Sequence, residues 1–280
     1  MMNGNIKPFI KWVGGKTQLL NPLNELISIN DIDTYVEPFV GGGALLFSLL
    51  NSYDIKNVII NDININLINL YKDIKNNPLK LIDGLRILQD EYYSLNEENV
   101  NEYFLQKRQE FNDKIDDKSA LFIFLNKTCF NGLYRVNSKG FFNVPCGYYK
   151  TPKICDADVI MADSQALQKT TILCGDYSQV LDYVGRKTLV YLDPPYKPIT
   201  KTSSFTSYDK SHFDDAEQVK LRDFCVDVDK RGGKFILSNS NNSYFDELYK
   251  DFTIDYVQAN RMVNCDGDKR GKIKELLIHN

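Results

Sequence analysis

TLVYLDPPY, residues 188–196, is a short apolar run that ends in an acid and two prolines. Its first five residues are apolar, β-branched or aromatic, a composition that predicts a buried parallel strand. Asp193 follows at the carboxyl end of that strand, and Pro194 and Pro195 cannot continue it. The stretch therefore predicts an open α/β sheet whose ligand site lies at the carboxyl ends of the strands.

The DPPY corner, residues 193–196, holds a carboxylate, a carbonyl and an aromatic ring on a stiff backbone. An exocyclic amino group on a heteroaromatic base is a poor nucleophile, because its lone pair is delocalised into the ring. Acceptors on both N–H bonds, the Asp193 carboxylate and the Pro194 carbonyl, favour a pyramidal nitrogen. Stacking of Tyr196 on the base is worth ~1–3 kcal/mol. The alternative interpretation is a turn that ends a strand, with Asp193 capping the next helix.

Length and composition predict a soluble cytoplasmic protein. The chain has 280 residues, enough for one large domain or two smaller ones. No apolar run approaches the ~18 residues of a membrane span, and the amino-terminal residues lack the apolar centre of a signal peptide. The 6 cysteines show no C-x-x-C pattern and there are only 2 histidines, which argues against zinc and against a disulfide scaffold.

The charge is unevenly distributed along the chain. The net charge is −3, yet residues 118–155 contain no Asp or Glu. This window carries six basic residues, which are Lys118, Lys127, Arg135, Lys139, Lys150 and Lys153. A basic face on an acidic protein predicts contact with phosphates, whereas the alternative is a merely solvated surface.

Two glycine turns precede helical patterns near the amino terminus. In KPFIKWVGGK, residues 7–16, a glycine turn brings Lys16 toward an anionic ligand, but Ile10 stands where a nucleotide-binding P-loop needs glycine. Residues 17–29 then predict a helix. In YVEPFVGGG, residues 35–43, a strand ending at Glu37 meets three glycines, the arrangement of a nucleotide-type cofactor site.

NVIIND, residues 57–62, predicts a second strand that ends in an acid. Asp62 lies about 20 residues beyond the glycines, where a carboxylate binds ribose hydroxyls in such folds. The alternative role for Asp62 is the N-cap of a helix over residues 63–74.

The middle of the chain predicts an insertion of different character. Apolar periodicity is helical over residues 79–92 and 103–111, and residues 120–125 form a compact apolar segment. Residues 127–153 are rich in Gly, Asn, aromatic and basic residues. Such a loop can place Arg on guanine edges and wedge apolar groups into a base stack.

Alternation of strands and helices resumes after the insertion. Strands are expected over residues 171–174 and 234–238, and helices over 217–230 and 244–249. Asp176 and Tyr177, after the first of these strands, are placed to flank an adenine ring. Residues 198–215 predict a loop over the site. Residues 252–257 and 273–279 predict antiparallel strands that close the sheet.

Several motifs occur together in one order: FIKWVGGK, EPFVGGG, NDIN, NGLYRVN, FNVP, GDY and DPPY. In this order the chain resembles the Dam-type and DpnM-like adenine-N6 DNA methyltransferases, the D12 class of the alpha group. Similar stretches extend to the carboxyl end. The resemblance implies a Rossmann-like S-adenosylmethionine-dependent methyltransferase sheet with an inserted, mostly helical DNA-recognition domain. The expected catalytic domain comprises residues 1–70 and 164–280, and the target-recognition domain comprises residues 71–163.

The resemblance also implies an activity and a set of site residues. The enzyme would transfer a methyl group from S-adenosyl-L-methionine to N6 of a flipped adenine in double-stranded DNA, within GATC, and release S-adenosyl-L-homocysteine without a metal. The catalytic residues would be Asp193, Pro194, Pro195 and Tyr196. The cofactor would be bound by Trp12, Lys16, Glu37, Pro38, Phe39, Gly41, Gly43, Asp62, Asp176, Tyr177 and Asp193.

Other matching positions imply contacts with DNA. They are Lys11, Phe130, Asn131, Leu133, Arg135, Asn137 and Pro145. Arg135 is the expected guanine reader, by bidentate contact to O6 and N7, and Lys11 the expected contact to the other guanine. The chain departs from some relatives at Phe130, where they have Tyr, and at Cys146, after FNVP.

Further expectations follow from the same resemblance. The protein would be a cytoplasmic monomer, encoded by a bacterium or by a phage in a bacterial host, with a cognate restriction endonuclease as a partner in restriction-modification systems. The alternatives are a cytosine-N4 methyltransferase, an RNA or protein glutamine methyltransferase, and a DNA-binding module that keeps the fold without activity.

Overall fold

The computed structural model describes residues 6–12, 14, 26, 31–196, 213–260 and 272–280. The chain forms two compact units, each built from three separate segments. Unit 1 comprises Met1–Gly15, Gly41–Tyr53 and Asn64–Cys174, and unit 2 comprises Lys16–Val40, Asp54–Ile63 and Gly175–Asn280. The predicted division was different: a catalytic domain of residues 1–70 and 164–280, and a target-recognition domain of residues 71–163. The two units do not test it, so it stays a prediction.

A mixed sheet of mostly parallel strands organises unit 2. β2 (Asn57–Asp62), β1 (Thr34–Glu37), β4 (Thr188–Leu192) and β5 (Lys234–Ser240) are parallel neighbours in that order. β7 (Lys272–His279) pairs antiparallel with β5 and with β6 (Thr253–Asn260), which confirms the two predicted antiparallel strands. With β3 (Thr170–Cys174) of unit 1, the strand order is β3-β2-β1-β4-β5-β7-β6.

The order of the strands reverses between β1 and β4. The chain runs outward from β1 through β2 to β3, and then returns to β4 on the other side of β1. Open α/β sheets bind ligands at the carboxyl side of such a reversal. Val36 lies opposite Val190. Glu37, one residue beyond Val36, and Asp193, three residues beyond Val190, therefore both lie toward this edge.

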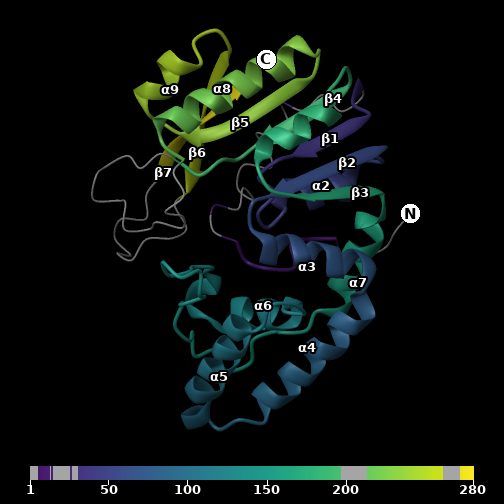
Figure 1. Cartoon of the computed structure of the whole chain (residues 1–280), viewed down its shortest axis with the longest axis vertical. Coiled ribbons are helices and arrows are strands. Elements are labelled where there is room, and N and C mark those ends of the chain that lie inside the picture. The colour runs from purple at the N-terminus through teal and green to yellow at the C-terminus, as the bar shows by residue number, and fades with distance from the viewer. Residues whose placement is uncertain (1–5, 13, 15–25, 27–30, 197–212, 261–271) are drawn as a thin grey trace. The chain divides into compact units, whose positions relative to one another are not determined.

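Burial explains why these segments are strands. All five residues of β4 are buried, as are the four apolar and polar residues that precede Asp62 in β2. Continuous burial on both faces is typical of central parallel strands. α8 (Asp215–Lys230) packs against β5 (Figure 1). The Asp214 carboxylate caps α8 by accepting from the Glu217 N–H at 3.0 Å.

The remaining elements of unit 2 are short. η6 (Tyr177–Tyr183) is a 3-10 helix that follows β3, and α9 (Ser243–Leu248) follows β5. The predicted helix over residues 17–29 lies outside the described residues except for Leu26, and so does most of the loop predicted over 198–215.

Unit 1 is mainly helical. Its longer helices are α2 (Ala44–Ser52), α3 (Ile65–Asn76), α4 (Pro78–Tyr93), α5 (Val100–Asp113), α6 (Ser119–Thr128) and α7 (Ala157–Ala166). Short 3-10 turns are η3 (Glu97–Asn99), η4 (Phe130–Gly132) and η5 (Leu167–Lys169). α6 packs against α3, α4 and α5, and it buries apolar side chains around its whole circumference. The apolar segment predicted at 120–125 is therefore a central helix without an exposed face.

A three-ring cluster joins distant segments of unit 1. Phe9 meets Phe47 of α2 at a ring-centroid distance of 5.8 Å and Tyr71 of α3 at 5.0 Å. Phe47 and Tyr71 stack at 6.3 Å. Aromatic pairs at these distances add attraction beyond the area they bury. This three-ring cluster fixes the segment before Lys11 and Trp12 against the two helices.

The alternative role predicted for Asp62 is wrong. α3 begins at Ile65, and its N-cap is Asn64, whose side chain accepts from the N–H groups of Asn66 and Leu67. Asn provides the same acceptor as Asp at this position, and the chain turns two residues later than expected. No helix among the described residues has both the length and the apolarity that a membrane span requires.

Candidate active site and recognition loop

The DPPY corner follows directly on the buried strand β4. Pro194 is buried, Asp193 and Tyr196 are half-buried, and Pro195 is exposed. Asp193 does not cap α8, since Asp214 holds that position. Asp193 therefore caps no helix among the described residues, and the DPPY corner as a ligand site, rather than a turn that ends the strand, stays a prediction.

Ser238 of β5 orients the Asp193 carboxylate. The Ser238 hydroxyl donates to Asp193 Oδ1 at 3.0 Å and also lies 3.2 Å from the Tyr191 hydroxyl. Ser238 is fully buried, so its position is set by the sheet. A carboxylate held by a hydroxyl on a rigid strand has a fixed orientation, as an acceptor needs for a ligand amine.

Glu275 of β7 anchors the ring of Tyr196. The Tyr196 hydroxyl donates to Glu275 Oε2 at 3.0 Å. Burial raises the pKa of Tyr196 well above its usual value, and the Asp193 and Glu275 carboxylates raise it further. The phenol therefore stays neutral and remains a hydrogen-bond donor, and its bond to Glu275 fixes the orientation of the ring.

Asn61, the residue before Asp62, joins three segments that carry predicted cofactor residues. Its side-chain amide donates to the Pro38 and Gly175 carbonyls, each at 3.0 Å, and its oxygen accepts from Gln179 at 2.7 Å. Asn61 is 1% exposed. The carboxyl ends of β1 and β2 and the turn at Gly175 are thus held together by one buried side chain.

The predicted acids lie on these joined segments. Glu37 is buried at the end of β1 and accepts from the Tyr35 hydroxyl at 2.8 Å. Asp62 ends β2, and its carbonyl accepts from the Gly175 N–H at 3.1 Å. Asp176 caps η6 by accepting from the Ser178 N–H at 2.9 Å, a structural role that the sequence did not suggest.

An aromatic group adjoins the joined segments. The Phe39 and Tyr177 rings lie 5.2 Å apart, and Phe213 lies 6.0 Å from Phe39. Burial raises the pKa of Tyr177, and nearby carboxylates such as Glu217 add to the shift. Apolar rings beside carboxylates suit a ligand that has both an aromatic base and hydroxyl groups.

The glycine turn and Trp12 lie in unit 1 and contact each other. A Cβ on Gly41 would lie 2.8 Å from Trp12 Cδ1, and one on Gly42 would lie 2.8 Å from Trp12 Cβ. Gly43 has φ +69°, and a Cβ there would meet the Tyr71 hydroxyl at 2.6 Å. Trp12 also stacks on Tyr134 at 5.5 Å. Glycine is therefore required for close approach at this turn. Lys16 lies outside the described residues.

Asn126 of α6 organises the predicted DNA-contacting residues. Its side chain accepts from the Lys11 N–H at 2.9 Å and donates to the carbonyls of Lys11 and Gly132, at 2.8 and 2.9 Å. The Lys11 ammonium lies 5.5 Å from the centre of the Tyr149 ring. Lys11 and the turn at Gly132 are therefore held side by side.

The loop after α6 exposes side chains suited to a base stack. Phe130 is 50% exposed, and its N–H donates to the carbonyl of the exposed Pro145 at 2.9 Å. Asn131 has φ +56°, and its N–H donates to the Tyr149 hydroxyl at 3.2 Å. Leu133, which is half-buried, follows the turn η4.

A hairpin carries the remaining predicted contacts. Val136 and Phe142 form an antiparallel bridge. The exposed guanidinium of Arg135 donates to Asn143 from Nε and Nη2. Asn137 uses its side-chain oxygen to accept from the N–H groups of Lys139 and Phe141, so it closes the turn in addition to its predicted DNA contact.

Acids from elsewhere in the chain partly balance the basic window. Lys150 pairs with Glu97 at 3.5 Å, and Lys153 pairs with Asp156 at 2.8 Å. Burial lowers the pKa of Lys127, and the Lys11 ammonium lowers it further. The predicted basic face is therefore less positive than the sequence window suggests.

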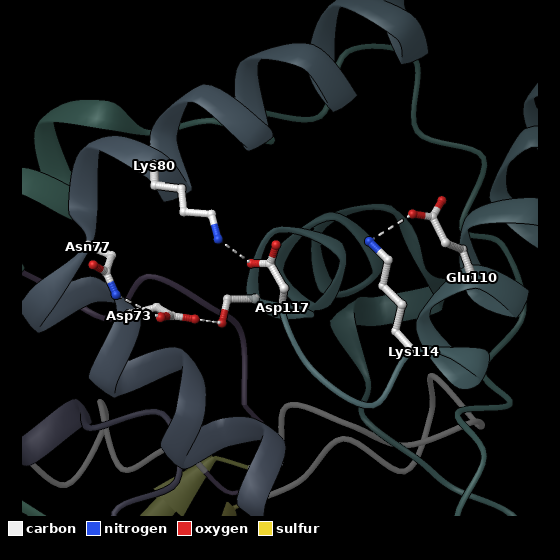
Figure 2. Close-up of polar contacts among 7 residues, drawn as sticks. Asp73, Asn77, Lys80, Glu110, Lys114 and Asp117 are labelled. Atoms are coloured by element: carbon white, nitrogen blue, oxygen red, sulfur yellow. Dashed lines mark hydrogen bonds and ion pairs between the residues drawn. The ribbon is translucent and has the colours of Figure 1, made fainter.

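A polar cleft of about 430 Å³ lies in unit 1 and contains none of the predicted site residues. It is lined by α3, the start of α4 and the segment before α6. Figure 2 shows Lys80 directed at Asp117, with a distance of 3.1 Å, and Asn77 bonded to Asp73. The polar groups that line this cleft therefore bond to one another.

Sequence reasoning missed the residues that position the site. Asn61, Asn126, Asn143, Ser238 and Glu275 all hold predicted residues through hydrogen bonds. A partial signal was available for two of them, since Asn61 and Ser238 are polar residues at the ends of apolar strand patterns. Among the described residues, no group of three potential metal ligands occurs.

Comparisons with known proteins identify the family. A model of the D12 class N6 adenine-specific DNA methyltransferases matches residues 12–263. The chain is 51% identical over 286 residues to the Type II methyltransferase M.MjaIII of Methanocaldococcus jannaschii, covering 98% of this chain and 99% of that protein.

Two further relatives agree. The DNA adenine methylase of Haemophilus influenzae is 33% identical, covering 97% of this chain and 92% of that protein. The DNA N-6-adenine-methyltransferase of Escherichia phage P1 is 34% identical, covering 97% of this chain and 35% of that protein. The match extends over nearly the whole chain and includes the DPPY corner, and the protein therefore belongs to the D12 class of N6 adenine-specific DNA methyltransferases.

Proposed function

We propose that this enzyme transfers a methyl group from S-adenosyl-L-methionine to N6 of an adenine flipped out of double-stranded DNA, within the sequence GATC. The observation that carries this proposal is the DPPY corner, in which Ser238 orients Asp193 and Glu275 anchors Tyr196. The GATC site rests on the resemblance of the motifs to Dam-type enzymes.

The corner provides what an aromatic amine needs in order to react. Asp193 accepts one N6–H bond and the Pro194 carbonyl accepts the other, so that the nitrogen lone pair turns away from the ring. S-adenosylmethionine, when bound, supplies a methyl carbon on a positively charged sulfur. The N6–C bond would form as the carbon–sulfur bond breaks with its electrons on sulfur, and the proton that N6 loses would pass by way of the Asp193 carboxylate to water. Positioning of the two reacting atoms supplies much of the rate.

Tyr196 provides the stacking surface for the flipped base. Its hydroxyl is fixed by Glu275, so the ring loses little freedom when a base stacks on it. Base–aromatic stacking is worth ~1–3 kcal/mol, which offsets part of the few kcal/mol that base flipping costs. Contacts between DNA and the predicted loop of residues 127–153 supply the remainder.

The residues joined by Asn61 suit the proposed cofactor. Asp62 would accept from ribose hydroxyls, and Phe39 and Tyr177 would contact the adenine ring, with Asp176 near its amino group. The buried Glu37 would face the positively charged part of the cofactor. Trp12, Gly41 and Gly43 of unit 1 carry the same expectation. Lys16, which lies outside the described residues, keeps its predicted role in cofactor binding.

The proposal extends to the setting of the reaction. The enzyme acts as a monomer on duplex DNA in the cytoplasm of a bacterial cell, as a host or a phage product. A cognate restriction endonuclease is the expected partner, since relatives bear Type II methyltransferase names.

The test is a methylation assay with labelled S-adenosylmethionine and a duplex that carries one GATC site. Digestion to nucleosides is expected to yield N6-methyladenine, and the duplex is expected to resist an endonuclease that cuts only unmethylated GATC. N4-methylcytosine as the product would replace the proposed base, and methylation of a different adenine would replace the proposed sequence.

Substitution of Asp193 tests the role of the corner. We expect Asp193→Ala to abolish methylation while DNA affinity, measured by fluorescence anisotropy, is kept. The matched control is Asp182→Ala, which removes an exposed acid from η6 and leaves turnover unchanged. Retained turnover in Asp193→Ala would contradict the proposed role of this carboxylate.

A further inference from the structure

Arg135 is held by a clamp within its own hairpin. Its Nε–H donates to Asn143 Oδ1 at 2.7 Å, and Nη2 donates to the Asn143 carbonyl at 3.2 Å. The backbones of these two residues are also joined, since the Asn143 N–H donates to the Arg135 carbonyl at 3.0 Å. One residue therefore engages the guanidinium with both its side chain and its backbone.

Asn143 binds one edge of the Arg135 guanidinium, and a second edge remains accessible to a ligand. Arginine has five N–H donors in a rigid plane. Nε and Nη2 form the side edge, which Asn143 takes up. The end edge carries one N–H of Nη1 and the second N–H of Nη2. These two donors match two adjacent acceptors such as guanine O6 and N7. Arg135 is exposed, so this edge is accessible to a ligand.

The hairpin itself is fixed to the helical part of unit 1. Asn112 of α5 donates to the Phe142 carbonyl at 3.1 Å and accepts from the Phe142 N–H at 2.8 Å. Phe142 is buried and precedes Asn143 directly. Asn112 therefore holds the backbone of the hairpin, whereas Asn143 holds the arginine side chain.

We propose that Asn143 is a positioning residue for sequence recognition: it fixes Arg135 so that the Nη1–Nη2 edge faces O6 and N7 of a guanine. An unrestrained arginine side chain has many rotamers, and this freedom must be lost when it binds a base. The clamp removes much of that loss before DNA arrives. This inference rests on the proposed function, because it concerns the guanine of the methylated site.

The first test uses the protein without DNA. We expect the Arg135 Nε–H group in ¹⁵N NMR relaxation to be as rigid as the backbone in the wild type and to become mobile in Asn143→Ala. Asn143→Asp keeps both acceptor oxygens and is expected to restore the rigidity. Equal mobility of Nε–H in the wild type and Asn143→Ala would overturn the clamp.

The second test measures recognition with a modified base. In a GATC duplex with 7-deazaguanine in place of guanine, the N7 acceptor is missing. N7 is one of the two acceptors of a bidentate contact worth ~1–3 kcal/mol in total, so we expect the wild-type kcat/KM to fall roughly 2- to 12-fold on this duplex. Asn143→Ala is expected to lose activity on the normal duplex and to show a much smaller further loss on the modified one.

The matched control is Asn112→Ala, which loosens the hairpin without touching Arg135. It is expected to lower DNA affinity but to keep the full 7-deazaguanine penalty. A penalty in Asn143→Ala as large as in the wild type would overturn the positioning role. If the wild type does not methylate the GATC duplex at all, the proposed function fails, and the NMR comparison alone decides for or against the clamp.

Discussion

Removal of the Asn61 side chain should loosen the carboxyl edge of the sheet. In Asn61→Ala the carbonyls of Pro38 and Gly175 each lose a donor that lies at 3.0 Å in the wild type. Asn61 is buried, and alanine leaves no group that could replace either bond. The buried Pro38 carbonyl without a donor costs roughly 1–3 kcal/mol, and the half-buried Gly175 carbonyl costs somewhat less because water can reach it. We therefore expect the free energy of unfolding to fall by about 2–5 kcal/mol.

The same substitution should weaken cofactor binding more than DNA binding. The segments that Asn61 joins carry Pro38, Asp62 and Asp176, and a loss of 1.4 kcal/mol in their positioning is about tenfold in affinity. Urea unfolding measures the stability, and isothermal titration calorimetry with S-adenosylhomocysteine measures the affinity. We expect at least about tenfold weaker binding of S-adenosylhomocysteine.

Gln179→Ala is the matched control for Asn61→Ala. It removes only the bond to Asn61 Oδ1, and the Gln179 side chain is exposed, so that water can take its place. The expected loss of stability is below about 1 kcal/mol. If Asn61→Ala unfolds at the same urea concentration as Gln179→Ala, Asn61 does not hold the three segments together.

Three further predictions concern other contacts. Glu275→Gln replaces the charged acceptor of the Tyr196 hydroxyl by a neutral one, which should cost about 1 kcal/mol and lower kcat/KM roughly fivefold. Tyr196→Phe should give a similar loss. Because both changes remove the same bond, the double variant should lose no more activity than either single variant. Gly132→Ala places a Cβ 2.6 Å from Lys11 Cδ at φ +64°, so DNA affinity should fall and stability should drop by about 1–2 kcal/mol, while calorimetry finds cofactor affinity unchanged. Burial raises the pKa of Asp163 from 3.8 to about 8. A raised pKa in the folded state stabilises the fold fully below pH 3.8, and this stability is lost as pH rises through about 8. Urea unfolding across this range should therefore show a shallower loss of stability in Asp163→Asn than in the wild type, and parallel curves would contradict the burial argument.

The sequence predicted the sheet well because most strands carry two signals, an apolar run and a residue that ends it. Runs such as residues 188–192 are apolar throughout, and each ends in an acid or a glycine that cannot continue the strand. In unit 1 the helical patterns predicted over residues 63–74, 79–92 and 103–111 are confirmed as α3, α4 and α5, whereas α6 and α7 were harder to predict. α6 is apolar on all sides, so that no period distinguishes it from a strand. α7 was not predicted, since a buried acid, Asp163, interrupts its apolar face.

The candidate site divides in a similar way. Residues that would touch a ligand, such as Asp193 and Arg135, stand out by their chemistry and their motifs. The residues that hold them, such as Ser238 and Asn143, are common polar types whose partners lie 45 and 8 residues away along the chain. Only the folded structure brings such pairs within hydrogen-bonding distance, and local sequence patterns do not predict them.

The three-ring cluster of Phe9, Phe47 and Tyr71 has a consequence for how the protein is made. Its rings come from three stretches of chain, and residues of unit 2 are synthesised between the second and the third. A nascent chain therefore cannot complete this part of unit 1 until α3 has left the ribosome, and it must keep two exposed aromatic side chains soluble in the meantime. Slow codons or a chaperone acting before residue 71 would affect the yield of this enzyme more than the same intervention near the carboxyl end.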